Sequence, residues 1–198
     1  MTRKTFFSFH YERDAWRAGQ VRNSNVIADE DKYGFIDAVE WESIERQGDD
    51  AIKRWIKGQL KGTSATVVLV GKETAERPWV LHEISESWNR GNGLVGVWIH
   101  GIKDSDKQTD VKGQNPFELF ELSDGTKLSA VCKIYDWVDA DGRNNLGKWI
   151  EEAVEIRSKY GSDEMISEIS EKRATVVQSN ARGFAPRSPW CADGGGER

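Results

Sequence analysis

The run Thr66-Val67-Val68-Leu69-Val70-Gly71 most constrains what this chain can fold into. It shows no alternation of polar and apolar residues, so a strand formed by it must be covered on both faces, as in a parallel sheet. Segments typical of strands and helices alternate on either side of it. They predict further strands at 5–9, 34–39, 94–99 and 133–137, and helices from Glu12 and at 49–61, 77–88 and 144–160. The sequence therefore predicts an α/β domain with a mainly parallel, five-stranded sheet flanked by helices.

Composition excludes several classes of function. The chain has 198 residues, enough for one domain with a real core and some extra length. Its formal net charge is -5 and its basic residues form no stripe, which argues against charge-driven binding of nucleic acid. The apolar run at 6–9 is far too short for a signal peptide or a membrane span. Cys132 and Cys191 form no C-x-x-C pattern and the histidines lack metal-ligand spacing, so we expect a cytoplasmic protein with no metal site and no membrane partner.

The segment 77–88 carries the best candidate for chemistry. Pro78 suits the first turn of a helix, where its missing N–H would be unpaired in any case. Trp79 and Glu83 lie four residues apart, so they share a helix face close to the carboxyl end of the preceding strand. Ligands bind at that end of the strands in open α/β sheets. Glu83 is then either a reactive carboxylate or a solvated residue stabilised by the helix N-terminus, with Trp79 as ordinary core.

Two other regions are notable for their composition. Trp41 lies in a predicted charged loop, 40–48, where it either folds back onto the body of the domain or lines a ligand site or a partner surface. An amphipathic stretch predicts a C-terminal helical extension at 161–178, after a first domain at 1–160. Residues 179–198 are rich in Gly, Arg, Ser and Pro, which predicts a disordered tail.

Several short segments together resemble the TIR-like proteins of the bacterial Thoeris antiphage system, over about residues 4–160. The segments are 4–11, 21–23, 41–42, 63–67, 79–84 and 135–137. The resemblance implies a three-layer, TIR/flavodoxin-like fold. The sequence Phe7-Ser8-Phe9-His10 departs from the commoner TIR pattern, in which charged residues follow an aromatic-Ser pair.

The resemblance also implies a function. Such proteins convert NAD+ to nicotinamide and a cyclic ADP-ribose isomer, which activates a separate effector protein. Glu83 would be the catalytic residue, NAD+ would be the substrate, and no cofactor is expected. The residues that would contact NAD+ are Ser8, Phe9, His10, Arg22, Asn23, Trp41 and Trp79.

Alternatives stay open at this point. Phe9 is otherwise a core residue, and Ser8 a helix cap. The whole domain is otherwise a non-enzymatic interaction module that signals by self-association and in which Glu83 is structural, since fold alone does not confer function. Self-association and a phage protein as the trigger are further expectations.

Overall fold

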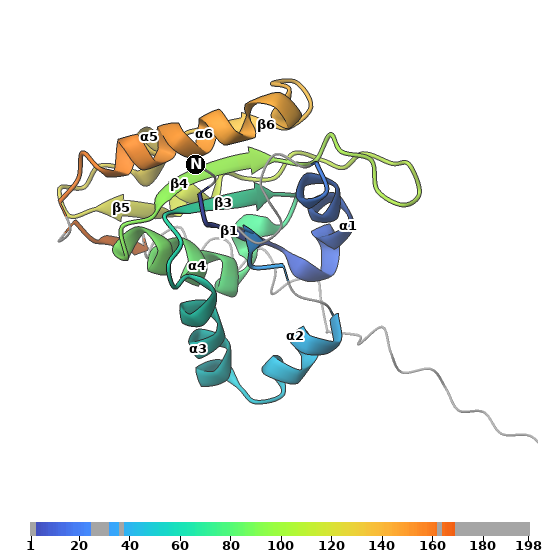
Figure 1. Ribbon diagram of the computed structural model, residues 1–198, viewed down its shortest axis with the longest axis horizontal. Helices are drawn as coiled ribbons and strands as arrows, with labels where there is room; N and C mark the ends of the chain where they lie inside the picture. Colours follow the sequence, from blue (N-terminus) through green and yellow to red (C-terminus); the bar gives the residue numbers. More distant parts are fainter. Residues whose placement is uncertain (1–2, 25–31, 36–37, 162–163, 169–198) are drawn as a thin grey trace, which may run out of the picture. The chain divides into compact units, whose positions relative to one another are not determined.

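The computed structural model describes residues 3–24, 32–35, 38–161 and 164–168 of the chain. Five strands form one sheet in the order β2-β1-β3-β4-β6, and every pairing in it is parallel (Figure 1). The strands are β1 (Thr5–Phe9), β2 (Lys32–Tyr33), β3 (Ala65–Val70), β4 (Gly93–Trp98) and β6 (Ile134–Asp136). The predicted α/β fold with a parallel sheet is confirmed, although β2 completes the five strands with two residues only.

Helices connect these strands and cover the sheet. They are α1 (Tyr11–Arg22), α2 (Ala38–Glu45), α3 (Asp49–Gln59), α4 (Pro78–Asn89), α5 (Leu128–Val131) and α6 (Gly142–Arg157), with the 3-10 turns η2 (Thr74–Glu76) and η3 (Pro116–Leu119). Strands β5 (Phe120–Leu122) and β7 (Ile166–Glu168) form a separate antiparallel pair. In the part of the chain that the structure describes, no helix has the length and apolar character needed to cross a membrane.

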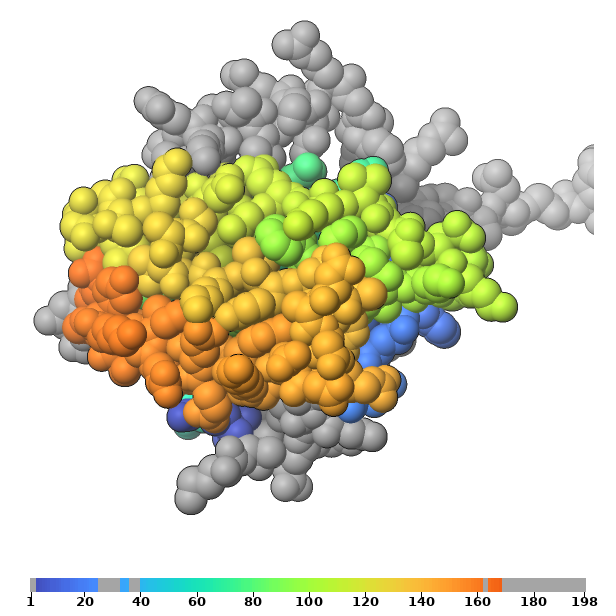
Figure 2. Space-filling view, turned by 90° about the horizontal axis from the view of Figure 1, so that it is seen from above, coloured from blue at the N-terminus to red at the C-terminus, as the bar shows by residue number. Residues whose placement is uncertain are grey.

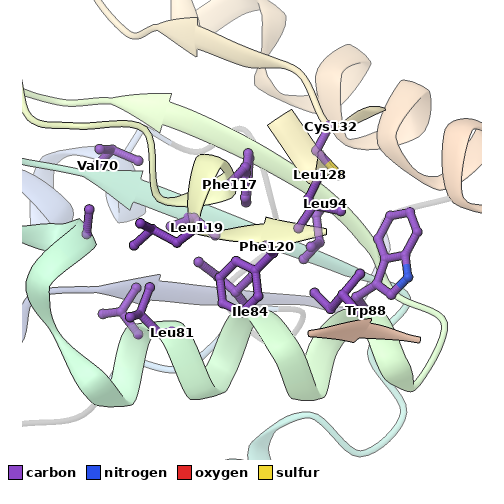
Figure 3. Packing of buried hydrophobic residues seen from close by; sticks show 14 of the residues in the cluster. Val70, Leu81, Ile84, Trp88, Leu94, Phe117, Leu119, Phe120, Leu128 and Cys132 are labelled. Atoms are coloured by element: carbon purple, nitrogen blue, oxygen red, sulfur yellow. The ribbon is translucent and has the colours of Figure 1, made fainter. Parts of the chain in front are cut away.

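Strand β3 lies at the centre of the sheet and all of its residues are buried, as predicted. Its side chains alternate between the two faces. Val67 and Leu69 pack in a core shared with α1 and α6, whereas Val68 and Val70 pack in a core shared with α4. Figure 3 shows Leu81, Ile84 and Trp88 of α4 reaching toward the sheet in this second core. The central strand is therefore held between two apolar layers.

Helix α6 covers one face of the sheet at very close range. Figure 2 shows α6, in orange, lying across the face seen from above. Gly93, the first residue of β4, makes this approach possible, because a Cβ atom there would lie 2.5 Å from backbone atoms of Ala153 and Val154 in α6. The helix begins at Gly142, earlier than the predicted start at 144.

The chain around Trp41 differs from the prediction. The strand predicted at 34–39 is wrong, because β2 is Lys32–Tyr33 and α2 already begins at Ala38. Trp41 belongs to α2 rather than to a loop. Trp41 and Ile44 lie three residues apart on this helix, and both pack against the core formed by Phe6 and α3. The periodicity of a short apolar run is the same for a strand and for a buried helix segment. Here the packing of the segment against α3 determines that it is a helix.

The C-terminal prediction is also wrong where the structure describes it. Ile166–Glu168 form strand β7, in place of the helical extension predicted at 161–178. Ile166 is buried and pairs with Leu122 of β5, so a distant ladder determines the conformation. Residues 162–163 and 169–178, and the predicted disordered tail at 179–198, lie outside the described residues.

The approach of α6 to β4 gives a test of this packing. Gly93→Ala should lower the free energy of unfolding by about 1–3 kcal/mol, because the added methyl group forces the helix backbone away from the sheet. Gly58→Ala in α3 is the matched control, since nothing lies within 4 Å of its added Cβ, and should stabilise by up to about 1 kcal/mol. Urea denaturation measures both values. A Gly93→Ala variant as stable as the wild type would contradict this packing.

Candidate active site

A pocket of about 170 Å³ opens where the end of β1 meets the start of α4. Helices α2 and α3 contribute a further wall through Trp41, Glu45 and Trp55. Aromatic side chains are the most frequent kind in its lining. The lining residues are Phe7, Phe9, His10, Tyr11, Glu12, Gly34, Trp41, Glu45, Trp55, Arg77, Pro78, Trp79, Val80 and Glu83.

Glu83 reaches this pocket from the second turn of α4. It is only 7% exposed, so the interpretation as a solvated helix residue is wrong. Its Oε2 accepts a hydrogen bond of 2.5 Å from the Oγ of Ser8. Burial raises the pKa of Glu83 to about 8, although the hydrogen bond from Ser8 opposes this rise. A carboxyl group with this pKa in a pocket is a candidate for catalysis.

Ser8 contacts Glu83 and is not among the residues that line the pocket. In β1 the side chains alternate, so that Phe7 and Phe9 pack with the core under α1 and α6 while Ser8 points to the α4 side. Ser8 does not cap a helix, because the residue at the N-cap of α1 is His10. The structure thus gives Ser8 a contact with the carboxylate, and its contact with the ligand stays a prediction.

Phe9 and His10, which the resemblance assigned to NAD+, both line the pocket. Phe9 also packs against the core, with its ring centroid 5.4 Å from that of Phe35. His10 is buried, and its Nδ1 has no hydrogen-bond partner among the described residues. Burial, with a further contribution from the charge of Arg77, lowers the pKa of His10. His10 is therefore neutral at pH 7 and keeps an unused ring nitrogen.

Trp41 and Trp79 lie on the pocket wall, although neither is fully buried. The Trp41 ring meets that of Trp55 edge-on at 5.8 Å and lies 6.3 Å from that of Tyr11. The inference that Trp79 is a buried core residue is wrong. The fully buried tryptophan of α4 is Trp88, nine residues further along the helix, because the face of the first turn is turned to the pocket.

Arg22 and Asn23 do not line the pocket. Both are exposed at the C-terminal end of α1. The Arg22 guanidinium lies over the ring of Phe35, 5.3 Å from its centroid. The backbone N–H of Asn23 donates a hydrogen bond to the carbonyl of Gly19 at the end of the helix. The structure therefore separates these two residues from the others that the resemblance assigned to NAD+.

Sequence reasoning missed three prominent lining residues, Tyr11, Trp55 and Arg77. Arg77 had a detectable signal, because it directly precedes Pro78 at a predicted helix start on the ligand edge of the sheet. Trp55 had none, since it lies on the apolar face of α3 and looks like core. Among the described residues, no three His, Cys, Asp or Glu side chains gather as a group that could hold a metal ion.

Comparison with known proteins gives two matches. Residues 6–104 match a family described as "Thoeris protein ThsB, TIR-like domain", and this range contains every residue that lines the pocket. The chain is also similar to a protein of Bacillus cereus (strain MSX-D12) named "Putative cyclic ADP-D-ribose synthase ThsB1". The two are 32% identical over 191 residues, covering 76% of this chain and 100% of that protein.

The burial of Glu83 predicts a pH-dependent stability. Its pKa is about 8 in the folded protein against 4.5 as its ordinary value, so between these values the folded state binds more protons than the unfolded state. The free energy of unfolding must then fall as the pH rises through this window. Glu83→Gln removes the titration, so it should gain a few kcal/mol relative to the wild type between about pH 5 and pH 8.5.

Urea denaturation at several pH values measures this difference. Glu86→Gln on the same helix is the control, because Glu86 does not line the pocket and its variant should follow the wild type at every pH. Parallel curves for the wild type and Glu83→Gln would show that Glu83 is not buried as described.

Proposed function

Because this chain belongs to the TIR-like ThsB family of the Thoeris system, we propose that it is an NAD+ cyclase with Glu83 as its catalytic residue. It cleaves the bond between nicotinamide and ribose and closes the remaining ADP-ribose into a cyclic messenger, which activates a separate antiphage effector. One observation carries the assignment of Glu83: its carboxyl group is buried in an aromatic pocket and held by Ser8. The relative named as a synthase supports an enzyme over a non-enzymatic interaction module.

One carboxylate is sufficient for this reaction. Nicotinamide leaves as a neutral molecule from a cationic ring, so its departure needs no general acid, unlike the leaving group of most glycosidases. Positive charge then develops on the ribose as the bond breaks. Glu83 stabilises this oxocarbenium-like ribose, and its burial strengthens the attraction because little water competes.

Substrate binding itself favours the reactive form of Glu83. Burial by itself favours the neutral carboxyl group. The nicotinamide ring of NAD+ carries a positive charge, and an opposite charge within a few ångströms lowers the pKa of a carboxyl group. The bound substrate therefore promotes loss of the proton, and the cationic transition state does so more strongly.

Ser8 acts in this proposal as a positioning residue. Its hydroxyl group donates to Oε2 of Glu83, which fixes the carboxylate and leaves Oε1 for the ribose. Trp41, Trp55 and Trp79 offer flat apolar surfaces on which a nicotinamide ring can stack. The pocket volume of about 170 Å³ is below the roughly 300–1,000 Å³ of sites for drug-sized ligands. The pocket thus encloses the scissile end of NAD+ and leaves the adenosine end outside.

Self-association, a phage protein as trigger, a cytoplasmic location and the absence of a resident cofactor remain part of the proposal through the resemblance alone.

Glu83→Gln tests the catalytic role directly. The variant keeps the shape of the side chain but loses the charge, so nicotinamide release should fall by about 10²–10³-fold. Chromatography of nicotinamide and the cyclic product measures it, with purified full-length protein and with lysate of phage-infected cells in case a trigger is needed. Glu86→Gln should retain wild-type turnover. Full turnover by Glu83→Gln would exclude the proposed role.

Ser8→Ala tests the positioning role through a pH profile. For the wild type, kcat/KM should rise with pH to a half-maximum near pH 8, because the ionised form of Glu83 is required in the free enzyme. Loss of the hydrogen bond from Ser8 raises the pKa of Glu83 further, so the profile of Ser8→Ala should move to higher pH. Ser8→Thr keeps a hydroxyl group and should restore the wild-type profile. Identical profiles for all three proteins would remove Ser8 from this role.

A further inference from the structure

Arg77 has an unusual place among the pocket residues. Of the described residues that line the pocket, it alone carries a permanent positive charge. Glu12, Glu45 and Glu83 contribute carboxyl groups, and burial keeps His10 neutral. An anionic group of a ligand in this pocket therefore finds one charged partner of opposite sign.

Building on the proposed NAD+ cleavage, we propose that Arg77, His10 and the first turn of α4 form a subsite for the phosphate on the nicotinamide ribose. This phosphate is attached to the same ribose that Glu83 would face. It must therefore lie in or at the mouth of the small pocket that holds the scissile bond.

The start of α4 suits an anion. The helix has 12 residues, and Arg77 occupies its N-cap without a side-chain hydrogen bond to the helix. The first turn of a helix leaves backbone N–H groups without acceptors in the helix, and its dipole favours a negative charge there. Pro78 has no N–H, but Trp79 and Val80 follow it, and all three line the pocket. Helix N-termini bind phosphate by this geometry in many proteins.

Two buried polar atoms at this place lack partners. Among the described residues, neither Nδ1 of His10 nor Nε of Arg77 has a hydrogen-bond partner. The side chain of His10 is only 8% exposed, so solvent does not compensate. Leaving a buried polar atom without a hydrogen-bond partner is energetically unfavourable. As the Nδ1–H tautomer His10 can donate to a phosphate oxygen, and Nε of Arg77 can donate to another oxygen of the same group, so both buried atoms would gain a partner.

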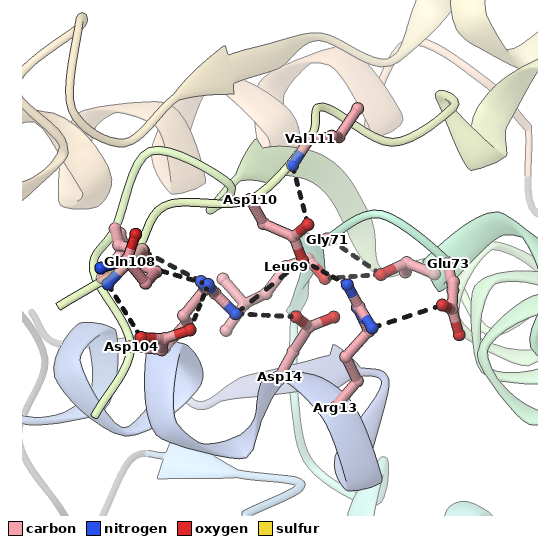
Figure 4. A network of polar contacts seen from close by, with 12 residues as sticks. Arg13, Asp14, Leu69, Gly71, Glu73, Asp104, Gln108, Asp110 and Val111 are labelled. Atoms are coloured by element: carbon pink, nitrogen blue, oxygen red, sulfur yellow. Dashed lines mark hydrogen bonds and ion pairs between the residues drawn. The ribbon is translucent and has the colours of Figure 1, made fainter. Parts of the chain in front are cut away.

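The present partner of Arg77 holds it at the edge of the pocket. Its Nη2 donates to Oε2 of Glu73 at 2.6 Å. Glu73 is in turn paired with Arg13 at 3.4 Å, and Arg13 donates to Asp110 at 2.8 Å (Figure 4). Arg13 thus holds Glu73 in place. Glu73 in turn orients the guanidinium of Arg77 and competes with a phosphate for this group. Removal of Glu73 should therefore strengthen phosphate binding, opposite in sign to removal of Arg77.

Two ligands that differ by one phosphate test the subsite. Nicotinamide riboside and nicotinamide mononucleotide are titrated calorimetrically into the full chain carrying Glu83→Gln, which slows cleavage by about 10²–10³-fold. The mononucleotide should bind at least about tenfold more tightly than the riboside, because a phosphate pairs well with arginine. Adding Arg77→Gln should reduce this ratio to near one with the riboside affinity unchanged, and adding Glu73→Gln should increase it.

Arg22→Gln is the matched control, because Arg22 is an arginine of the same domain that does not line the pocket. It should leave the ratio as it is. An unchanged ratio in Arg77→Gln, equal weakening of both ligands, or a loss of the ratio in Arg22→Gln would overturn the subsite. Nicotinamide release by the chain with Glu83 intact tests the proposed activity separately. Failure of the activity is therefore seen in nicotinamide release, and failure of the subsite in the affinity ratio. If Arg77→Gln lowers the melting temperature, the expected increase of the affinity ratio in Glu73→Gln decides the test.

Discussion

Burial of β3 on both faces is the constraint on which the position of the pocket depends. Strand β1 pairs with β3 in parallel from Thr5 to Phe9, so the end of β1 is fixed beside the loop that leads from β3 into α4. The apolar side chains of α4 then hold the helix against the same strand. As a result, Ser8 and Glu83 meet although 75 residues separate them in the chain.

Two buried carboxyl groups show how differently the fold treats an acid. Asp14 is fully buried, and burial raises its pKa to about 6, but Arg17 lies 3.9 Å away in a network of charges on α1 and the following loops. Glu83 contacts a hydroxyl group and faces the pocket. A buried acid close to an arginine belongs to the architecture, whereas one that faces a cavity can exchange its proton for a cationic ligand.

Local patterns in the sequence were sufficient for β1, β3 and α4. They also placed Glu83 near the ligand edge of the sheet, through its spacing from Trp79 and its position after a buried strand, but only the resemblance assigned it to catalysis. The wall of the pocket could not be found in this way, because Trp41 and Trp55 line it only through the packing of α2 against α3. Likewise β7 is a strand because it pairs with β5, more than 40 residues away in the sequence. The resemblance assigned Arg22 to NAD+, but Arg22 lies at the C-terminal end of α1 with its guanidinium over the ring of Phe35.

The short edge strands have a consequence for assembly. Strand β2 has two residues and β6 has three, and these strands form the two edges of the five-stranded sheet. A long exposed edge offers unpaired N–H and C=O groups on which another chain can add a strand. Within the described residues, this sheet offers very few such groups to a second copy. Addition of a strand from a second chain is therefore disfavoured at both edges of this sheet, and its backbone ladder places no demand on any surface through which the protein meets a partner.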